Sequence, residues 1–245
     1  MIEETHLLEP FKGYAPPPFP CPVCGASLVR RGNEITADES NASRQEFDPN
    51  FTDELRYGVF SLRLVCSNSL CRESVICTGN FNNERDEQAD GTPFLARLLT
   101  PLFFTPTIHI FKLPTSLPKK IKKPLLEAFS LYWSNPGASG NSLRIAVEAL
   151  MDNQCVRKRD RDKSLRSFRL HEKITEFART NQDIGDKLLA VKWLGNSGSH
   201  LTGLKPEQVV TGFNLMQYAV EELFEKRRQR LTNVAKRINL RKGPV

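Results

Sequence analysis

Hydrophobic and polar residues alternate in the first half of the chain, and this pattern predicts short β-strands. The alternation is clearest over residues 57–65, a second strand is predicted over 73–78, and a third over 106–113. The stretches between them are polar and rich in turn-forming residues. We therefore expect an inserted loop over residues 31–54 and a linker over residues 80–92.

After Pro118 the apolar residues recur every three or four positions, which predicts helices to the end of the chain. We expect the first helix to begin at Pro124 and to stop at residues 135–137, and the second to begin at Asn141 or Ser142. The last helix follows Gly203 and Pro206 and is long. The five apolar stripes are Leu125, Ala128, Phe129 and Tyr132; Leu143, Ala146, Val147, Leu150 and Met151; Leu170, Ile174, Phe177 and Ala178; Ile184, Leu188, Val191 and Leu194; and Val209, Phe213, Met216, Val220, Leu223, Leu231, Val234 and Ile238.

This division predicts an α+β protein with two domains. Residues 1–115 form a small β module with an inserted loop and a linker, entered through a proline-rich segment over residues 1–20 that we expect to lie extended on the surface. Residues 116–245 form a bundle of helices joined by short connections, with a basic tail. A length of 245 residues suits one medium domain with a smaller module.

Composition places the chain among globular proteins and excludes a membrane-spanning helix. Apolar residues make up 39% of the chain, and no apolar run approaches the roughly 18 residues that a membrane helix needs. The first ten residues carry acids and no apolar core of a signal peptide. We therefore expect a cytoplasmic protein without membrane partners.

The net charge of +7 is concentrated at the C-terminus. Residues 226–245 carry eight basic residues and no acid, so the first 225 residues sum to 7 − 8 = −1. Such a tail is either a solvated helix surface or a contact for nucleic acid or an acidic partner. The candidate nucleic-acid contacts are Lys226, Arg227, Arg228, Arg230, Lys236 and Arg237.

Four of the six cysteines have the spacing of a metal site. Cys21 and Cys24 form a Cys-Pro-x-Cys-Gly knuckle, and Cys66 and Cys71 form a second pair. Four thiolates close a tetrahedral site, which predicts one structural zinc ion per chain. Cys77 competes for the fourth position, but it lies in an apolar strand, and 41 residues between the two pairs is long for a ribbon.

The helical half carries two groups of polar residues with the potential for chemistry. Arg144 and Glu148 lie four residues apart on the second helix and therefore share a face. The segment from Lys192 to His200 contains Gly195, expected to end or bend the fourth helix, and Asn196, which can cap the next segment.

These motifs resemble a known family. The knuckle at Cys21, Leu117-Pro118, Glu127-Ala128, the Arg144/Glu148 pair, and Gly195, Asn196 and His200 occur in the order of the bacterial domain of unknown function 4145 family. Its helical part is similar to the HEPN (higher eukaryotes and prokaryotes nucleotide-binding) superfamily. The resemblance implies a zinc ribbon followed by a HEPN-like bundle that dimerises, in a bacterial defence or toxin-like setting with a partner protein.

The resemblance also implies a mechanism for the members that are active. They cleave RNA without metal at a dimer interface, with a histidine in proton transfer and an arginine on the scissile phosphate. His200 matches the histidine and Asn196 is retained, but Gly195 stands where the arginine is often found. The candidate catalytic set is His200 and Asn196 with Lys192 or Arg144 nearby, and a structural helix junction at His200 is the alternative.

Three functions are compatible with these features. The first is a zinc-ribbon and HEPN-like protein that binds nucleic acid or a partner. The second is a metal-independent endoribonuclease that uses His200. The third is a protein-interaction subunit without a nucleic-acid role.

Overall fold

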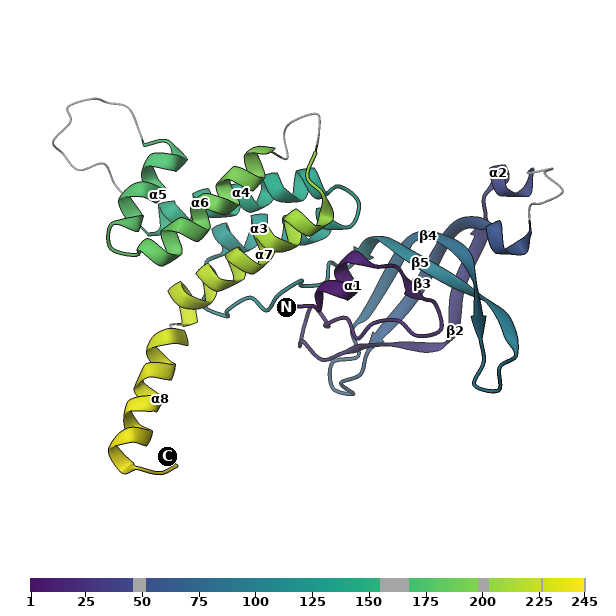
Figure 1. The fold of residues 1–245 in the computed structure, drawn as a ribbon, viewed down its shortest axis with the longest axis horizontal. Coiled ribbons are helices and arrows are strands. Elements are labelled where there is room, and N and C mark those ends of the chain that lie inside the picture. The colour runs from purple at the N-terminus through teal and green to yellow at the C-terminus, as the bar shows by residue number, and fades with distance from the viewer. Residues whose placement is uncertain (46–51, 155–167, 198–202, 226, 245) are drawn as a thin grey trace. The chain divides into compact units, whose positions relative to one another are not determined.

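The structure is a computed structural model that describes residues 1–45, 52–154, 168–197, 203–225 and 227–244 (Figure 1). Its backbone contacts divide the chain into two units. The sheet unit comprises Met1–Ile110 and Phe129–Pro136, and the helical unit comprises Phe111–Ala128 and Gly137–Val245. An antiparallel sheet followed by helices confirms the coarse α+β prediction.

A five-stranded antiparallel sheet in the order β1-β5-β4-β3-β2 forms the sheet unit (Figure 1). Burial alternates along β3, so that Phe60, Leu62 and Leu64 face the core, as the alternation over residues 57–65 predicts. The strands are β1 (Phe11–Lys12), β2 (Leu28–Glu39), β3 (Tyr57–Cys66), β4 (Ser74–Glu87) and β5 (Pro93–Thr105), with α2 (Asn41–Arg44) and the 3-10 helix η1 (Asp53–Leu55) between β2 and β3.

Aromatic side chains pack under the sheet and hold the N-terminal segment in the core. Phe19 is fully buried, with its ring 5.0 Å from that of Phe104 and 6.0 Å from that of Trp133. The hydroxyl of Tyr132 donates to the carbonyl oxygen of Leu7 in α1 (Glu4–Leu8) at 3.0 Å. The prediction of a surface segment over residues 1–20 is therefore wrong, because its apolar residues supply core contacts that its proline content conceals.

Three further predictions are wrong, two of them for a common physical reason. Residues 31–39 belong to β2 rather than to a loop, and residues 80–87 extend β4 rather than forming a linker. Both are paired strands with polar side chains in solvent, so their composition resembles that of loops. Residues 106–113 form no strand; their apolar pattern reflects the burial of Ile108, Ile110 and Phe111, and the strand β5 lies just before them.

Most residues of the predicted apolar stripes are buried as far as Val220, whereas the continuation of the last stripe at Leu231, Val234 and Ile238 is exposed. Pro124 lies inside α3, which begins directly after Pro118, and α4 begins at Pro136 rather than at residue 141. Proline in a first turn is favourable because its missing N–H has no partner there, and this explains the earlier start of α4. The helices are α3 (Lys119–Tyr132), α4 (Pro136–Asn153), α5 (Leu170–Ala178), α6 (Gln182–Ser197), α7 (Pro206–Val220), the π-helical segment η2 (Glu221–Glu225) and α8 (Arg227–Arg241).

Candidate metal centre

The first cysteine knuckle is a tight turn before β2. The backbone N–H of Cys21 donates to the carbonyl oxygen of Ala26 at 2.7 Å, and the N–H of Gly25 donates to that of Cys21 at 2.9 Å. Gly25 has φ +77°, a left-handed conformation that other residues adopt only with strain. The Cys-Pro-x-Cys-Gly sequence therefore forms the turn that aims both thiols to one side.

The second knuckle joins β3 to β4. The backbone N–H of Cys66 donates to the carbonyl oxygen of Glu73 at 2.8 Å, and the N–H of Cys71 donates to that of Asn68 at 3.0 Å. The side-chain oxygen of Asn68 also accepts from the N–H of Leu70 at 3.0 Å. These bonds fold the four residues between the cysteines into a compact loop.

Strand pairing brings the two knuckles together. Leu28, the first residue of β2, pairs with Cys66, the last residue of β3. The backbone N–H of Ser67 then donates to the carbonyl oxygen of Ser27 at 2.9 Å. The 41 residues between the pairs run out along β2 and return along β3, so their number does not separate the cysteines.

The four sulfurs have the separations that a tetrahedral metal site requires. All four lie within 4.8 Å of one another, with Cys21 Sγ 3.8 Å from Cys71 Sγ and Cys24 Sγ 3.4 Å from Cys66 Sγ. Sulfurs at about 2.3 Å from a tetrahedral zinc lie about 3.8 Å apart, so the cluster fits the ion. Cys77 is buried elsewhere in the sheet and is outside the cluster, and Cys155 lies outside the described residues.

The thiols of the cluster differ in acidity. The backbone N–H of Ala26 lowers the pKa of Cys24 to about 7, with a further contribution from the thiol of Cys66. Burial raises the pKa of Cys66 to about 12. A buried thiol of this kind ionises readily only when a cation replaces its proton, so metal binding here releases protons.

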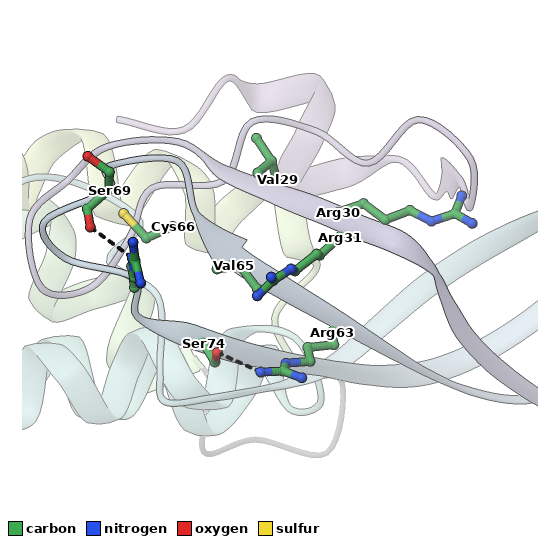
Figure 2. A pocket seen from close by; sticks show the side chains of 9 residues that line it. Val29, Arg30, Arg31, Arg63, Val65, Cys66, Ser69 and Ser74 are labelled. Atoms are coloured by element: carbon green, nitrogen blue, oxygen red, sulfur yellow. Dashed lines mark hydrogen bonds between the residues drawn. The ribbon is translucent and has the colours of Figure 1, made fainter.

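An arginine-rich pocket lies next to the cysteine cluster, and sequence reasoning missed it. The pocket, of about 410 Å³, is lined by β2, β3 and the second knuckle (Figure 2). Arg31 and Arg63 alternate with Val29 and Val65 on neighbouring strands, a signal that is readable only once β2 is recognised as a strand. The lining residues are Val29, Arg30, Arg31, Arg63, Val65, Cys66, Ser69, Arg72 and Ser74.

In the helical unit, Arg144 and Gly195 lie at one helix crossing. A Cβ atom on Gly195 would be 2.6 Å from Arg144 Cβ and 2.6 Å from the Gly140 carbonyl oxygen, so α4 and α6 meet there. Gly195 thus lies inside α6 rather than at its end, and Asn196 also lies within α6 instead of capping a new helix. Arg144 Nη1 is 4.0 Å from Glu148 Oε2, the pair predicted from the sequence.

The side chain of Lys192 lies over the ring of its neighbour Trp193. Its Nζ lies 3.3 Å from the ring centroid of Trp193, which is 53% exposed, and the ring of His171 is 5.9 Å from that of Trp193. These three side chains, with Arg169, line a second pocket of about 430 Å³. His200 lies outside the described residues.

The basic C-terminal segment forms an exposed helix. All residues from 230 to 242 are exposed, including Arg230, Lys236 and Arg237. Arg227 and Arg228 begin α8, and Lys226 lies outside the described residues. An apolar stripe of Leu231, Val234 and Ile238 is also exposed, so the predicted long apolar face stops packing after η2.

The fold and the cluster define a two-unit protein with a sheet that carries four clustered cysteines and a helical region. In the helical region, residues 126–241 match the family model described as domain of unknown function (DUF4145). Residues 9–107 match a different family, described as domain of unknown function (DUF8608). The predicted resemblance is therefore confirmed for the helices, whereas both cysteine knuckles lie among the residues that match the second family.

No curated protein and no solved structure matches the chain. Among the described residues, no helix combines the length and apolar character needed to cross a membrane.

Proposed function

We propose that the protein binds nucleic acid and that a structural zinc ion stabilises its sheet unit. The observation that carries the proposal is α8, an exposed helix in a segment with eight basic residues and no acid. Lysine and arginine on such a helix neutralise phosphates and release counterions, which is the main source of affinity that is independent of base sequence. The helix therefore suits a polyanion better than an apolar ligand.

The zinc assignment is supported by the donor set. Four thiols at tetrahedral spacing favour zinc over magnesium or calcium, which prefer oxygen ligands. A closed set of four thiolates leaves no position for water or substrate, so the ion would be structural. In this proposal Cys21, Cys24, Cys66 and Cys71 hold the ion in ribbon-type knuckles on a larger sheet.

A triple variant of α8, compared with the intact protein, tests the nucleic-acid proposal. Arg230→Gln, Lys236→Gln and Arg237→Gln together remove three charges from exposed positions of α8, and the triple variant should retain its fold. The affinity for a labelled RNA or DNA should fall, and the slope of log K against log salt should flatten by about 2–3. Unchanged affinity, or no binding by the intact protein at low salt, would contradict the proposal.

A second candidate function rests on the apolar stripe of α8. Leu231 is 60% exposed, and with Val234 and Ile238 it forms an apolar line with helical spacing. Phosphate contacts do not require such a line, whereas a partner protein or a second copy of the chain does. Sedimentation of the full chain with and without Leu231→Asp distinguishes a homodimer from a monomer that awaits another partner.

The endoribonuclease alternative has less support. If the helical region is HEPN-like, active members often carry arginine where this chain has Gly195. Any side chain at that position would collide with Arg144 and Gly140. A cation for the scissile phosphate would therefore come from Arg144 or Lys192, which lie in different surroundings. We expect no RNA cleavage with chelator present; cleavage that disappears in a folded His200→Ala variant would overturn this expectation.

A further inference from the structure

The arginine pocket next to the cysteine cluster lies on an exposed face of the sheet. It is formed by the start of β2, the end of β3 and the knuckle loop, and Figure 2 shows the side chains of Arg31 and Arg63 beside Val65. Arg30 extends away from Arg31 in the same view, and its Nη1 donates to the carbonyl oxygen of Gly13 at 3.3 Å. The exposed arginines of the lining are Arg31, Arg63 and Arg72.

The lining of the pocket is strongly cationic. Among the described residues that line it none is acidic, and the hydroxyl groups come from Ser69 and Ser74. Arg63 Nη2 donates to Ser74 Oγ at 3.4 Å, and Arg72 Nε donates to the carbonyl oxygen of Ser69 at 3.0 Å. The lining therefore combines guanidinium groups, whose planar shape and charge match phosphate oxygens, with hydroxyl groups.

The same face of the sheet continues to an exposed aromatic ring. Arg63 pairs with Ile76, and two residues along β4 Thr78 pairs with Phe103, so these side chains share a face. Phe103 is 51% exposed. Two strand spacings of about 4.8 Å and one two-residue step of about 6.6 Å put it about 12 Å from Arg63 along the sheet.

We propose that this face binds single-stranded nucleic acid, with a backbone phosphate in the arginine pocket and a base stacked on Phe103. Cationic side chains along the backbone together with exposed aromatic rings are the usual basis of single-strand binding. The proposal rests on the proposed nucleic-acid function and adds a second contact surface, in the sheet unit and separate from α8. Single strands are favoured over duplex because only unpaired bases offer their faces to the ring.

The metal site would support this surface. Cys66 lines the pocket, and Arg72 directly follows Cys71. Arg72 has φ 50°, so its orientation depends on the fold of the knuckle loop. Removal of the metal should therefore weaken single-strand binding as well as stability.

Three full-length variants test the proposal by fluorescence anisotropy with a labelled twelve-nucleotide single strand, in DNA and RNA arms. Arg31→Gln with Arg63→Gln should flatten the salt slope by about 1.4, because two fewer phosphates release counterions. Phe103→Ala should weaken binding by about tenfold or more, the loss typical of one stacked base. Arg85→Gln with Arg97→Gln is the control, since it removes the same charge from exposed positions of β4 and β5 that point to the opposite face.

The outcomes separate this proposal from that for α8. If the pocket and Phe103 variants bind like the control while the α8 variant loses affinity, the sheet proposal is overturned and the nucleic-acid function stands. If only the sheet variants lose affinity, the sheet proposal stands and the role of α8 is overturned. An equal loss of duplex and single-strand affinity in Phe103→Ala, or full competition by inorganic phosphate at the same concentration as the oligonucleotide, would also overturn a single-strand surface.

Discussion

Different kinds of contact stabilise the sheet unit and the helical unit internally. In the sheet unit, residues distant in sequence are joined by strand pairing, by the ring cluster around Phe19 and by four cysteines at one end. In the helical unit, local apolar stripes pack and two helices approach closely through Gly140 and Gly195. The stability of the sheet unit therefore depends on a few contacts between residues distant in sequence, whereas that of the helical unit depends on the packing of local apolar stripes.

The two tryptophans make this difference measurable. Trp133 belongs to the sheet unit and packs against Phe19 and Phe104, and Trp193 belongs to the helical unit. Trp193→Phe leaves a fluorescent reporter of the sheet unit, and Trp133→Phe leaves one of the helical unit. The unfolding of each unit can therefore be followed separately.

The largest effect is expected for a cysteine of the cluster. If the cluster holds zinc as proposed, Cys66→Ser should abolish the binding of about one zinc ion per chain and destabilise the sheet unit by about 4 kcal/mol or more, since a lost structural metal is among the most damaging changes. Metal analysis and thermal unfolding followed through Trp133 measure both effects. The control, Cys77→Ala, should keep the metal; a variant at Cys77 that loses it instead would show that the ligands are wrongly assigned.

A smaller effect is expected at the crossing of α4 and α6. Gly195→Ala places a methyl group 2.6 Å from Arg144 Cβ and should destabilise the helical unit by about 1–3 kcal/mol. Denaturant unfolding followed through Trp193 measures this loss.

Gly212→Ala in α7 is the matched control. Its added methyl group meets the flexible ends of two side chains, Leu143 at 3.1 Å and Leu194 at 3.5 Å, and alanine gains helix propensity of up to about 1 kcal/mol. If both variants lose the same stability, close helix approach is not the reason for Gly195.

An acid-dependent effect is expected in the sheet unit. Hydrogen bonds from Lys12 at 2.7 Å and Tyr14 at 2.5 Å lower the pKa of Asp86 to about 2. Because the folded-state pKa is below the ordinary value of about 3.9, this stabilisation is complete above about pH 4 and is lost as the pH falls toward 2. Melting temperatures of the native protein and Asp86→Asn should differ at pH 6 and approach each other as the pH falls to 2; a constant difference would mean that the charge of Asp86 does not matter.

The smallest effect on stability is expected in α8. Leu231→Ala should change the free energy of unfolding by less than about 0.5 kcal/mol, because the side chain is 60% exposed. A larger loss would show that the stripe is covered, and a concentration-dependent loss would identify a second copy as its cover.

Local spacing was sufficient for the presence of the helices, though not for where α3 and α4 begin, and for picking out the four cysteines that cluster. The apolar stripes of α4 to α7 follow the helical period, which depends only on neighbours three and four residues apart. The two cysteine pairs are visible for the same reason, because each knuckle is a turn of a few residues. The polar strands were not predictable in this way, because half of the side chains of β2 and of the outer part of β4 lie in solvent and resemble those of a loop.

Contacts between residues distant in sequence could be identified only from the tertiary structure. Pairing of Leu28 with Cys66 closes the cysteine cluster across 41 residues, and the same pairing brings Arg31 and Arg63 to one pocket. Gly195 acts as a contact point of two helices rather than as a helix end, which depends on the position of α4. Sequence patterns report the face that a residue presents, but partners across a sheet or a helix crossing depend on register and close approach, which distant parts of the chain determine together.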